Sequence, residues 1–418
     1  MPAKHHYSKW ERYSYEGLGS DLSQDNQGRI FMSGHTTGVD IRDMSEMTIV
    51  HAGVDSIRQL YHGKIKASWL PFMQEETPNE ITLMGVTFAV GKMGKNSGYR
   101  LRFQNNEIGI IILLGSYYRH LDQEGAHLKI ELSPQFIAQS SRDGVQSWLE
   151  SISGHLLERY KPAGCAVHLA VDFQGAEIPK DLQERFVTRC RYKSIYSGIQ
   201  DFDIPSNSVS YGNHESYLFG KAASLQTSVY RKDLEIIVRD KVDYWQDVWT
   251  NYSLGLYNPD QPVWRVEMRL HHTCVRELGG SMGKELETWQ QVYEYLTDLW
   301  RYAMNNNRLM VDKKRLDPLW QLLTDDVDMY LPAKGFNLFR KKKSDISAVT
   351  RNIGLFLGNF ITLMARKRAD AAMIYVSIKK MYIWEDVRRY WLSKGGLGAF
   401  RSWIDDMLQE RLLRGKAA

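Results

Sequence analysis

The chain has 418 residues, of which 43% are hydrophobic, and its formal net charge is +5. This length favours two domains, and this composition excludes a wholly disordered chain because it supplies enough apolar surface for a core. Its three cysteines lie far apart without a CxxC pair. That spacing argues against a disulfide framework or a thiolate zinc site, and it indicates a reducing, cytoplasmic compartment.

No stretch of the sequence predicts a secretory signal or a membrane span. The opening residues MPAKHHYSKWERYSYEG lack an apolar segment. The longest apolar run, IGLFLGNFITLMA at residues 353–365, is shorter than the roughly 20 residues that cross a bilayer. We therefore expect a soluble cytoplasmic protein with no membrane partner.

The charged residues are distributed unevenly along the chain. Residues 334–418 hold 18 Lys and Arg against 7 Asp and Glu, whereas the rest holds 36 against 42. A basic C-terminal region behind an acidic body indicates contact with nucleic acid in that region, and a solvated helical surface is the alternative. The cations that we expect to contact DNA phosphates are Arg340, Lys341, Lys342, Lys343, Arg366, Lys367, Arg368, Arg388 and Arg389.

The first half of the chain predicts an arm followed by alternating strands and helices. Residues 1–48 are polar and rich in Gly, Ser and Asp, which predicts an extended N-terminal arm. A strand with a helical or second-strand continuation is expected from residue 47. The further elements that we expect are strands at 81–90, 99–104, 107–117, 126–133 and 166–173, and helices at 140–160 and 179–192.

The second half predicts two alternating strands and then helices. Residues 198–213 are expected to form a loop, and strands follow at about 216–232 and 263–270. Beyond Gly280 the apolar spacing becomes helical. We therefore expect an arm at 1–48, an α+β domain at 49–279 with a mixed or antiparallel sheet and flanking helices, and a helical, basic C-terminal domain at 280–418. The boundary is expected near residues 279–335, and Lys334-Gly335 offers a second break.

Period-two alternation places chemically useful side chains on one face of the predicted sheet. In the strand expected at about 216–232, Ser228, Tyr230 and Lys232 share a face. In the second, Arg265 and Glu267 share a face. The adjacent His271 and His272 would point to opposite faces of a strand, which argues against a metal pair.

Acidic and imidazole groups on separate strands predict a divalent-metal site. The candidates are Glu131, Glu267 and one of His168 and Asp172. Because four residues along a strand span about 13 Å, His168 and Asp172 are not expected to bind one ion together. Oxygen and nitrogen donors of this kind suit Mg²⁺ or Mn²⁺.

A tyrosine beside such a site favours chemistry on a phosphodiester. A phenol with a pKa of about 10 is a weak nucleophile near neutral pH, so Tyr230 would need activation. Lys232 or Arg265 would then offset the charge that develops in the transition state. For Tyr230, cross-strand packing is the alternative role.

Four sequence blocks resemble the replication initiation factor (Rep_trans) family of rolling-circle initiators and conjugative relaxases. These blocks are SYLFGKAASLQTSVYRKDLE, VWRVEMRL, IELSP and AVHLAVDF, and their order and spacing agree with the family over roughly residues 50–275. The resemblance implies that Tyr230 is the nicking nucleophile and that Glu131 and Glu267 occupy positions of family carboxylates. It also implies a nicking domain that starts rolling-circle replication or conjugative transfer of a plasmid, phage or integrative element.

The resemblance further implies a reaction and its partners. The tyrosine would join the 5′ end of a cut strand and free a 3′-hydroxyl at single-stranded or supercoiled origin DNA. A host polymerase and a host helicase would act with it, and homodimer formation is left open.

Two departures from the family pattern keep other interpretations open. His168 stands where the family has an aspartate, and Ala166 replaces the preceding arginine; the segment between Gly220 and Tyr230 is one residue shorter. His168 could bind a transition metal such as Mn²⁺, or Asp172 could have taken the role. A non-catalytic origin-binding regulator on the same fold is the alternative function, and a metal-dependent hydrolytic phosphodiesterase is a more distant one.

Overall fold

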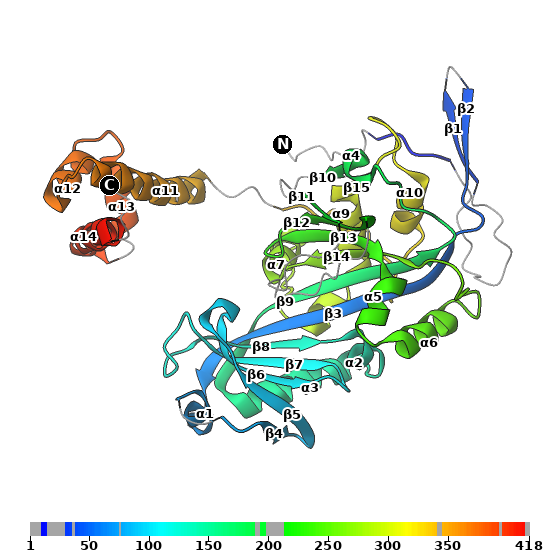
Figure 1. Cartoon of the computed structure of the whole chain (residues 1–418), viewed down its shortest axis with the longest axis horizontal. Coiled ribbons are helices and arrows are strands. Elements are labelled where there is room, and N and C mark those ends of the chain that lie inside the picture. The colour runs from blue at the N-terminus through cyan, green and yellow to red at the C-terminus, as the bar shows by residue number, and fades with distance from the viewer. Residues whose placement is uncertain are drawn as a thin grey trace. The chain divides into compact units, whose positions relative to one another are not determined.

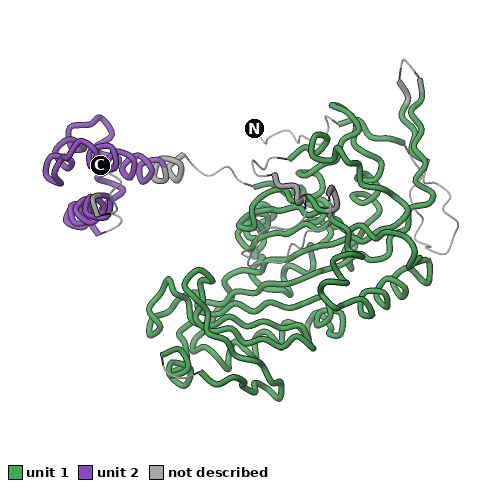
Figure 2. The backbone as a smooth tube through the Cα atoms, in the orientation of Figure 1, with its two compact units in different colours: residues 1–340 green, residues 341–418 purple. Residues whose placement is uncertain are grey.

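The structure is a computed structural model, and it describes residues 10–14, 30–35, 38–74, 77–188, 193–197, 213–340, 345–392 and 395–413. The chain divides into two compact units, Met1–Arg340 and Lys341–Ala418 (Figure 2).

An eleven-stranded sheet runs through the larger unit (Figure 1). Every pair of neighbouring strands in it is antiparallel. Its strands, in spatial order, are β11 (Lys193–Ser197), β12 (Asn213–Gly220), β13 (Leu225–Arg231), β14 (Trp264–Leu270), β9 (Leu157–Gln174), β3 (Thr48–Ile65), β8 (Gly125–Leu132), β7 (Ile110–Ser116), β6 (Tyr99–Asn105), β5 (Val86–Lys92) and β4 (Glu80–Leu83). The two central strands, β9 and β3, are the longest and join the halves of the sheet.

Short strand pairs and ten α-helices complete the described part of the larger unit. The pairs are β1 (Ile30–His35) with β2 (Gly38–Asp43), and β10 (Phe186–Thr188) with β15 (Asn307–Leu309). The helices are α1 (Leu70–Gln74), α2 (Pro134–Ala138), α3 (Arg142–Leu156), α4 (Leu182–Arg185), α5 (Lys232–Val238), α6 (Val242–Tyr252), α7 (His272–Ser281), α8 (Trp289–Tyr293), α9 (Leu296–Asn306) and α10 (Pro318–Asp325).

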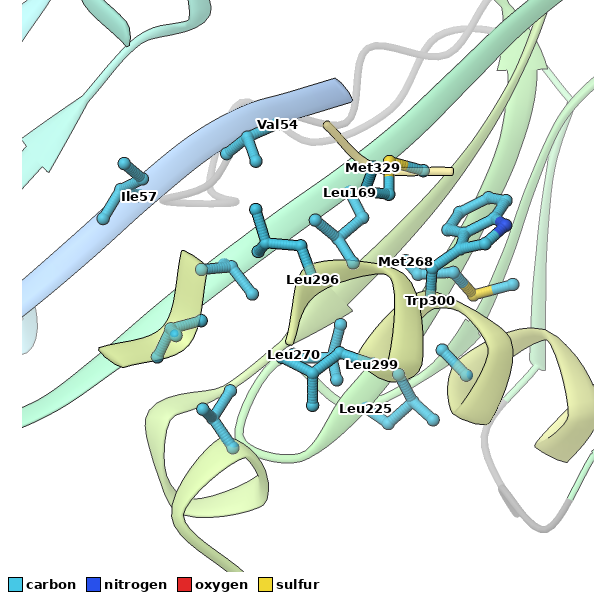
Figure 3. Packing of buried hydrophobic residues seen from close by; sticks show 14 of the residues in the cluster. Val54, Ile57, Leu169, Leu225, Met268, Leu270, Leu296, Leu299, Trp300 and Met329 are labelled. Carbon is cyan, nitrogen blue, oxygen red and sulfur yellow. The ribbon is translucent and has the colours of Figure 1, made fainter. Parts of the chain in front are cut away.

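The main core lies between one face of the sheet and helices that cover it. On α9, buried side chains recur at Leu296, Leu299, Trp300 and Ala303, which is the spacing of one helix face. Figure 3 shows Leu296, Leu299 and Trp300 of α9 beside side chains of β3, β9 and β14, which include Val54, Leu169 and Met268. Because alternate residues of β14 enter this core, its remaining side chains are left for the opposite face.

The structure places the division between the two units beyond residue 279 and close to the second break expected at Lys334-Gly335. The larger unit extends to Arg340, and residues from its last third, such as Trp289, Trp300 and Trp320, are fully buried in the same core as the sheet. The predicted N-terminal arm takes part in the fold of the larger unit. Tyr13 is buried in the main core, and β1 pairs with β2.

Several predicted elements differ in extent. The segment from residue 47 forms one long strand, Thr48–Ile65, without a helical continuation. Of the predicted helix 179–192 the structure describes residues 179–188; there Leu182–Arg185 is helical, and the strand Phe186–Thr188 follows it. The tyrosine strand ends at Arg231, so Lys232 begins a helix instead of continuing the strand.

The smaller unit is a helical bundle of α11 (Asp345–Arg366), α12 (Ala371–Lys379), α13 (Trp384–Leu392) and α14 (Gly396–Leu413). Its own core includes Leu357, Ile374, Trp391 and Phe400. The predicted fold class, α+β with an antiparallel sheet, flanking helices and a helical C-terminal part, is confirmed at this level. Among the described helices, none has the length and apolar character that crossing a bilayer requires.

Candidate functional site

Polar side chains from four adjacent strands gather on the sheet face that points away from α9. The register places Tyr230 opposite Arg265, and Arg265 opposite Asp172. One step along, Ser228 lies opposite Glu267, and then Arg269 lies opposite His168. Because β13, β14 and β9 pair side by side, the polar side chains that alternate along these three strands lie together in one cluster.

A β-bulge in β3 adds Asp55 to this face. Val54 pairs with Leu169 and Ser56 pairs with His168, so Asp55 is the extra residue between two consecutive partners. A bulge changes the direction in which the following side chains point, and it often occurs beside functional sites. Here it brings the Asp55 carboxylate into reach of Arg265 on β14, with which it forms an ion pair.

Glu267 contacts three other residues of the cluster, Tyr230, Arg269 and His168. It is 1% exposed, and it accepts two hydrogen bonds from Arg269, Nε to Oε1 at 2.8 Å and Nη2 to Oε2 at 3.0 Å. His168 Nδ1 lies 3.2 Å from Glu267 Oε1. Burial alone would raise the pKa of Glu267, but the charge of Arg269 and the His168 hydrogen bond hold that pKa well below its ordinary value. Glu267 is therefore a carboxylate at neutral pH.

Tyr230 contacts Glu267 through its hydroxyl. The Tyr230 hydroxyl donates a hydrogen bond to Glu267 Oε2 at 3.3 Å, and the residue is 9% exposed. Burial, and then the negative charge of Glu267, raise the pKa of the phenol well above its ordinary value. As a nucleophile, Tyr230 would thus need a positive charge to approach before it could lose its proton.

Asp55, His168 and Glu267 together meet the geometry of a cation site. Each offers one ligand atom, and these three atoms lie within 4.8 Å of one another. Two ligand atoms in adjacent positions around an octahedral ion, each about 2.1 Å from the ion, lie about 3 Å apart. The 3.2 Å between His168 Nδ1 and Glu267 Oε1 fits that requirement. One imidazole and two carboxylates fit Mn²⁺ or Mg²⁺, and the site would have to share both carboxylates with arginines.

His168 would have to change its tautomer to bind a metal through Nδ1. Burial lowers its pKa, and the hydrogen bond to Glu267 opposes that change only in part, so the ring is neutral at neutral pH. While Nδ1–H donates to the Glu267 carboxylate, the lone pair is on Nε2, and Nδ1 becomes a ligand only when the proton moves to Nε2.

Asp172 and Arg265 form a separate, fully buried ion pair. Arg265 donates from Nε to Asp172 Oδ1 at 2.5 Å and from Nη2 to Asp172 Oδ2 at 2.7 Å. Trp249 Nε1 also donates to Asp172 Oδ2, at 2.8 Å. Asp172 is thereby outside the three-residue cation group, and Arg265 holds Asp172 and Asp55 in place.

The remaining predicted site residues lie around this cluster. Lys232 Nζ is 5.9 Å from the centre of the Tyr230 ring and donates to Glu235 Oε2 at 2.6 Å. Glu131 forms ion pairs with Lys129 at 2.7 Å and with Arg58 at 3.4 Å, and it is not part of the cation group. Asp55 is the residue of that group which the sequence reasoning missed; its signal was an acidic side chain within an apolar strand.

A small basic pocket of about 100 Å³ lies beside His168. Among the side chains that line it are Arg58, Lys129, His271 and His272. The prediction that the two histidines point to opposite faces is wrong, because β14 ends at Leu270 and His271 caps α7. Their ring centres are 4.0 Å apart. A pocket with this lining suits an anionic oxygen group such as a phosphate.

The predicted DNA contacts lie in two different settings. Arg340 belongs to the larger unit, where it donates to Glu277 and to Ser224 at 2.5 and 2.6 Å. In the smaller unit the other described members of the set are all exposed: Arg366, Lys367, Arg368, Arg388 and Arg389. Lys341, Lys342 and Lys343 lie outside the described residues.

The fold and cluster define an α+β protein with a tyrosine hydrogen-bonded to a carboxylate of a candidate cation site. The chain is 32% identical over 394 residues to a protein of Pseudomonas phage Pf1 described as uncharacterized protein ORF430, a match that covers 90% of each protein. The chain therefore belongs to the same family as this phage protein. No protein-family model matches the chain, and no solved structure matches it.

Proposed function

We propose that this protein is a DNA nicking-joining enzyme that starts rolling-circle replication of a phage genome. The observation that carries the proposal is the hydrogen bond between the Tyr230 hydroxyl and Glu267, a member of the Asp55–His168–Glu267 group. The resemblance of four sequence blocks to the Rep_trans family supports it independently. The phage relative favours a phage over a plasmid or a conjugative element as the source.

In the proposed reaction Tyr230 Oη attacks a backbone phosphorus atom. The Oη–P bond forms, the bond from phosphorus to the 3′ oxygen breaks, and the cut strand's 5′ phosphate stays on the tyrosine. The phenolic proton passes to a water molecule, because Glu267, whose pKa is held well below its ordinary value, is too weak a base to keep it. The departing 3′ oxygen takes up a proton and becomes the hydroxyl that primes synthesis.

The surrounding residues would make this step feasible. A divalent cation bound by Asp55, His168 and Glu267 would polarise the phosphate and favour loss of the phenolic proton. Arg265 would hold Asp55, and Lys232 would add positive charge near the Tyr230 ring. Host polymerase and helicase would act on the nicked origin.

A non-catalytic DNA-binding regulator is the second candidate. The observation that favours it is the bidentate contact of Arg269, which already neutralises both oxygens of Glu267. In that case the cluster would be a structural ion-pair network. A buried network of this kind also perturbs pKa values without any catalysis.

One experiment separates these functions. Supercoiled DNA of the phage element is incubated with the protein and Mn²⁺ or Mg²⁺, and the products are denatured and separated by electrophoresis. A protein–DNA adduct that disappears in Tyr230→Phe supports the nicking-joining enzyme. DNA binding without cutting supports the regulator, and nicking that survives Tyr230→Phe indicates hydrolysis by water.

A further inference from the structure

A second, larger cavity of about 890 Å³ opens beside the candidate site. Its walls come from β3, from the start of α3, from α6 and α8, and from the segment that holds Tyr330. Six of the seventeen lining residues have aromatic side chains: His51, Tyr244, Tyr252, Trp289, Tyr293 and Tyr330. We call it the aromatic cavity. Its volume lies within the range of small-ligand sites, about 300–1,000 Å³.

Direct contacts connect the aromatic cavity to residues beside the cation group. His51 pairs with Asp172 across β3 and β9, and His51 Nδ1 lies 3.8 Å from Asp172 Oδ2. Tyr330 Oη accepts a hydrogen bond from the backbone N–H of Val54, the residue before the Asp55 bulge, at 3.2 Å. Burial and then the charge of Asp55 raise the pKa of Tyr244 to about 12, which places Tyr244 within electrostatic reach of the cation group.

The aromatic side chains are arranged for stacking. The Tyr293 and Tyr330 rings are stacked, with centres 5.7 Å apart and planes at 15°. Tyr330 is held with φ at 67°, a left-handed conformation that strains a residue other than glycine. Tyr252 contacts the His51 ring and remains 39% exposed. Exposed aromatic rings at the wall of a cavity provide flat surfaces for a flat ligand.

Polar side chains in the lining suit a ligand with hydrogen-bonding edges. Ser140 and Asn251 line the aromatic cavity together with the aromatic residues. Their hydroxyl and amide groups can both donate and accept hydrogen bonds.

The charges in the lining disfavour a phosphate. Asp247 and Asp328 line the aromatic cavity, whereas its cation, Arg142, is already bonded to Asp143 and Glu294. A neutral, planar group with donors and acceptors on its edge matches this lining better than an anion. Nucleobases have that chemistry.

We propose that the aromatic cavity binds an unpaired nucleobase of the DNA strand whose phosphodiester lies at the Asp55–His168–Glu267 group. This inference rests on the proposed function and adds a base-binding site, formed by the aromatic cavity, for the single-stranded DNA that the family resemblance implies. A base inside a duplex has its faces and its pairing edge occupied, so only an unpaired or extruded base can enter such a cavity. Base stacking on an aromatic side chain strengthens the binding of single-stranded nucleic acid.

The test measures binding without cutting. A fluorescein-labelled single-stranded oligonucleotide of mixed sequence is titrated with Tyr230→Phe protein in EDTA, and anisotropy gives the dissociation constant. Adding Tyr252→Ala is expected to weaken binding about tenfold, while Tyr252→Phe, which keeps the ring, retains the affinity. Tyr118→Ala is the matched control, because Tyr118 is 73% exposed and does not line the aromatic cavity. Circular dichroism verifies that each variant is folded.

The outcomes separate this inference from the nicking proposal. Equal affinity of Tyr252→Ala and its parent overturns the base-binding inference, even if the wild-type protein forms an adduct. A loss confined to Tyr252→Ala supports it, even if no adduct ever forms. Absence of measurable affinity for single-stranded DNA in the Tyr230→Phe parent also overturns it. A duplex of the same sequence should show no dependence on Tyr252.

Discussion

The Tyr230 hydroxyl and the Glu267 carboxylate meet diagonally across β13 and β14, 3.3 Å apart. Tyr230 lies opposite Arg265, and Glu267 lies opposite Ser228, so the two are offset by one step on the same face. This contact ties the candidate nucleophile to the candidate cation ligands. It also helps to keep the phenol protonated until another positive charge arrives, because burial and then the negative charge of Glu267 raise the pKa of Tyr230.

Asp55→Asn should weaken Mn²⁺ binding at least tenfold. The substitution removes a charged oxygen from the three-residue group but keeps the size of the side chain. Isothermal titration calorimetry with MnCl₂ measures the affinity. Glu131→Gln is the matched control, since Glu131 pairs with Lys129 and Arg58 outside this group. A larger loss in Glu131→Gln than in Asp55→Asn would restore the ligand set predicted from the sequence.

Arg265→Met should destabilise the fold by about 3–5 kcal/mol. Removal of one partner of a buried ion pair leaves the other charge without compensation. Asp172 and Arg265 are both 0% exposed. Without Arg265, Asp172 would still accept the hydrogen bond from Trp249, but it would lose the guanidinium that balances its charge. Urea unfolding of the variant measures the change. The double variant Arg265→Met with Asp172→Leu should recover part of the loss, and no recovery would mean that the pair is not the cause.

Acid should destabilise the protein partly through His51. Burial lowers the pKa of His51 to about 4, although Asp172 opposes this change, while the unfolded chain has the ordinary value of about 6.5. The unfolded state therefore binds the proton first, and the stabilisation present above pH 6.5 is lost as the pH falls toward 4. Between about pH 7 and pH 5 this amounts to about 2 kcal/mol.

His51→Gln should flatten this pH dependence. Urea unfolding at both pH values measures it, with the exposed His120→Gln as the control. His272, whose pKa is also lowered to about 4 by burial and by neighbouring positive charge, should keep part of the slope. An unchanged slope in His51→Gln would mean that His51 is protonated in the folded protein.

A chain that ends at Arg340 should fold cooperatively, whereas one that ends at residue 279 should not. The shorter chain lacks Trp289, Trp300 and Trp320, which are fully buried in the core of the larger unit. Thermal unfolding followed by circular dichroism compares the two. Cooperative unfolding of the shorter chain would contradict the boundary at residue 340.

The same truncation tests the role of the smaller unit in DNA binding. Residues 341–418 carry 16 Lys and Arg against 7 Asp and Glu. If their exposed cations contact phosphates, removing them should lower the affinity for DNA and reduce its dependence on salt. An unchanged salt dependence would assign those charges to solubility.

Local patterns predicted the faces of the strands but not the partners of the side chains. Alternation in β14 identified Glu267 as polar-facing, because side-chain direction within a strand follows from backbone geometry alone. The pairing of Asp172 with Arg265 depends on the register between distant strands, which no local pattern encodes. Asp55 was missed because a bulge, and not the strict alternation, places it.

The domain boundary was misplaced for a similar reason. Helices α8, α9 and α10 carry an apolar face, and that face has the same spacing whether it covers a sheet or packs in a separate bundle. Only the structure shows that side chains such as Trp300 pack on the strands. The helical period predicted that the residues beyond 280 form helices, but it could not predict which surface those helices cover.

The most direct test identifies the amino acid that carries the DNA. The adduct from a nicking reaction is treated with nuclease and trypsin, and mass spectrometry locates the nucleotide on a peptide. A nucleotide joined through phosphate to the Tyr230 side chain, and absent after Asp55→Asn, is the predicted result. A nucleotide on another residue, or complete cleavage with no peptide adduct, would contradict the assignment of Tyr230 as nucleophile.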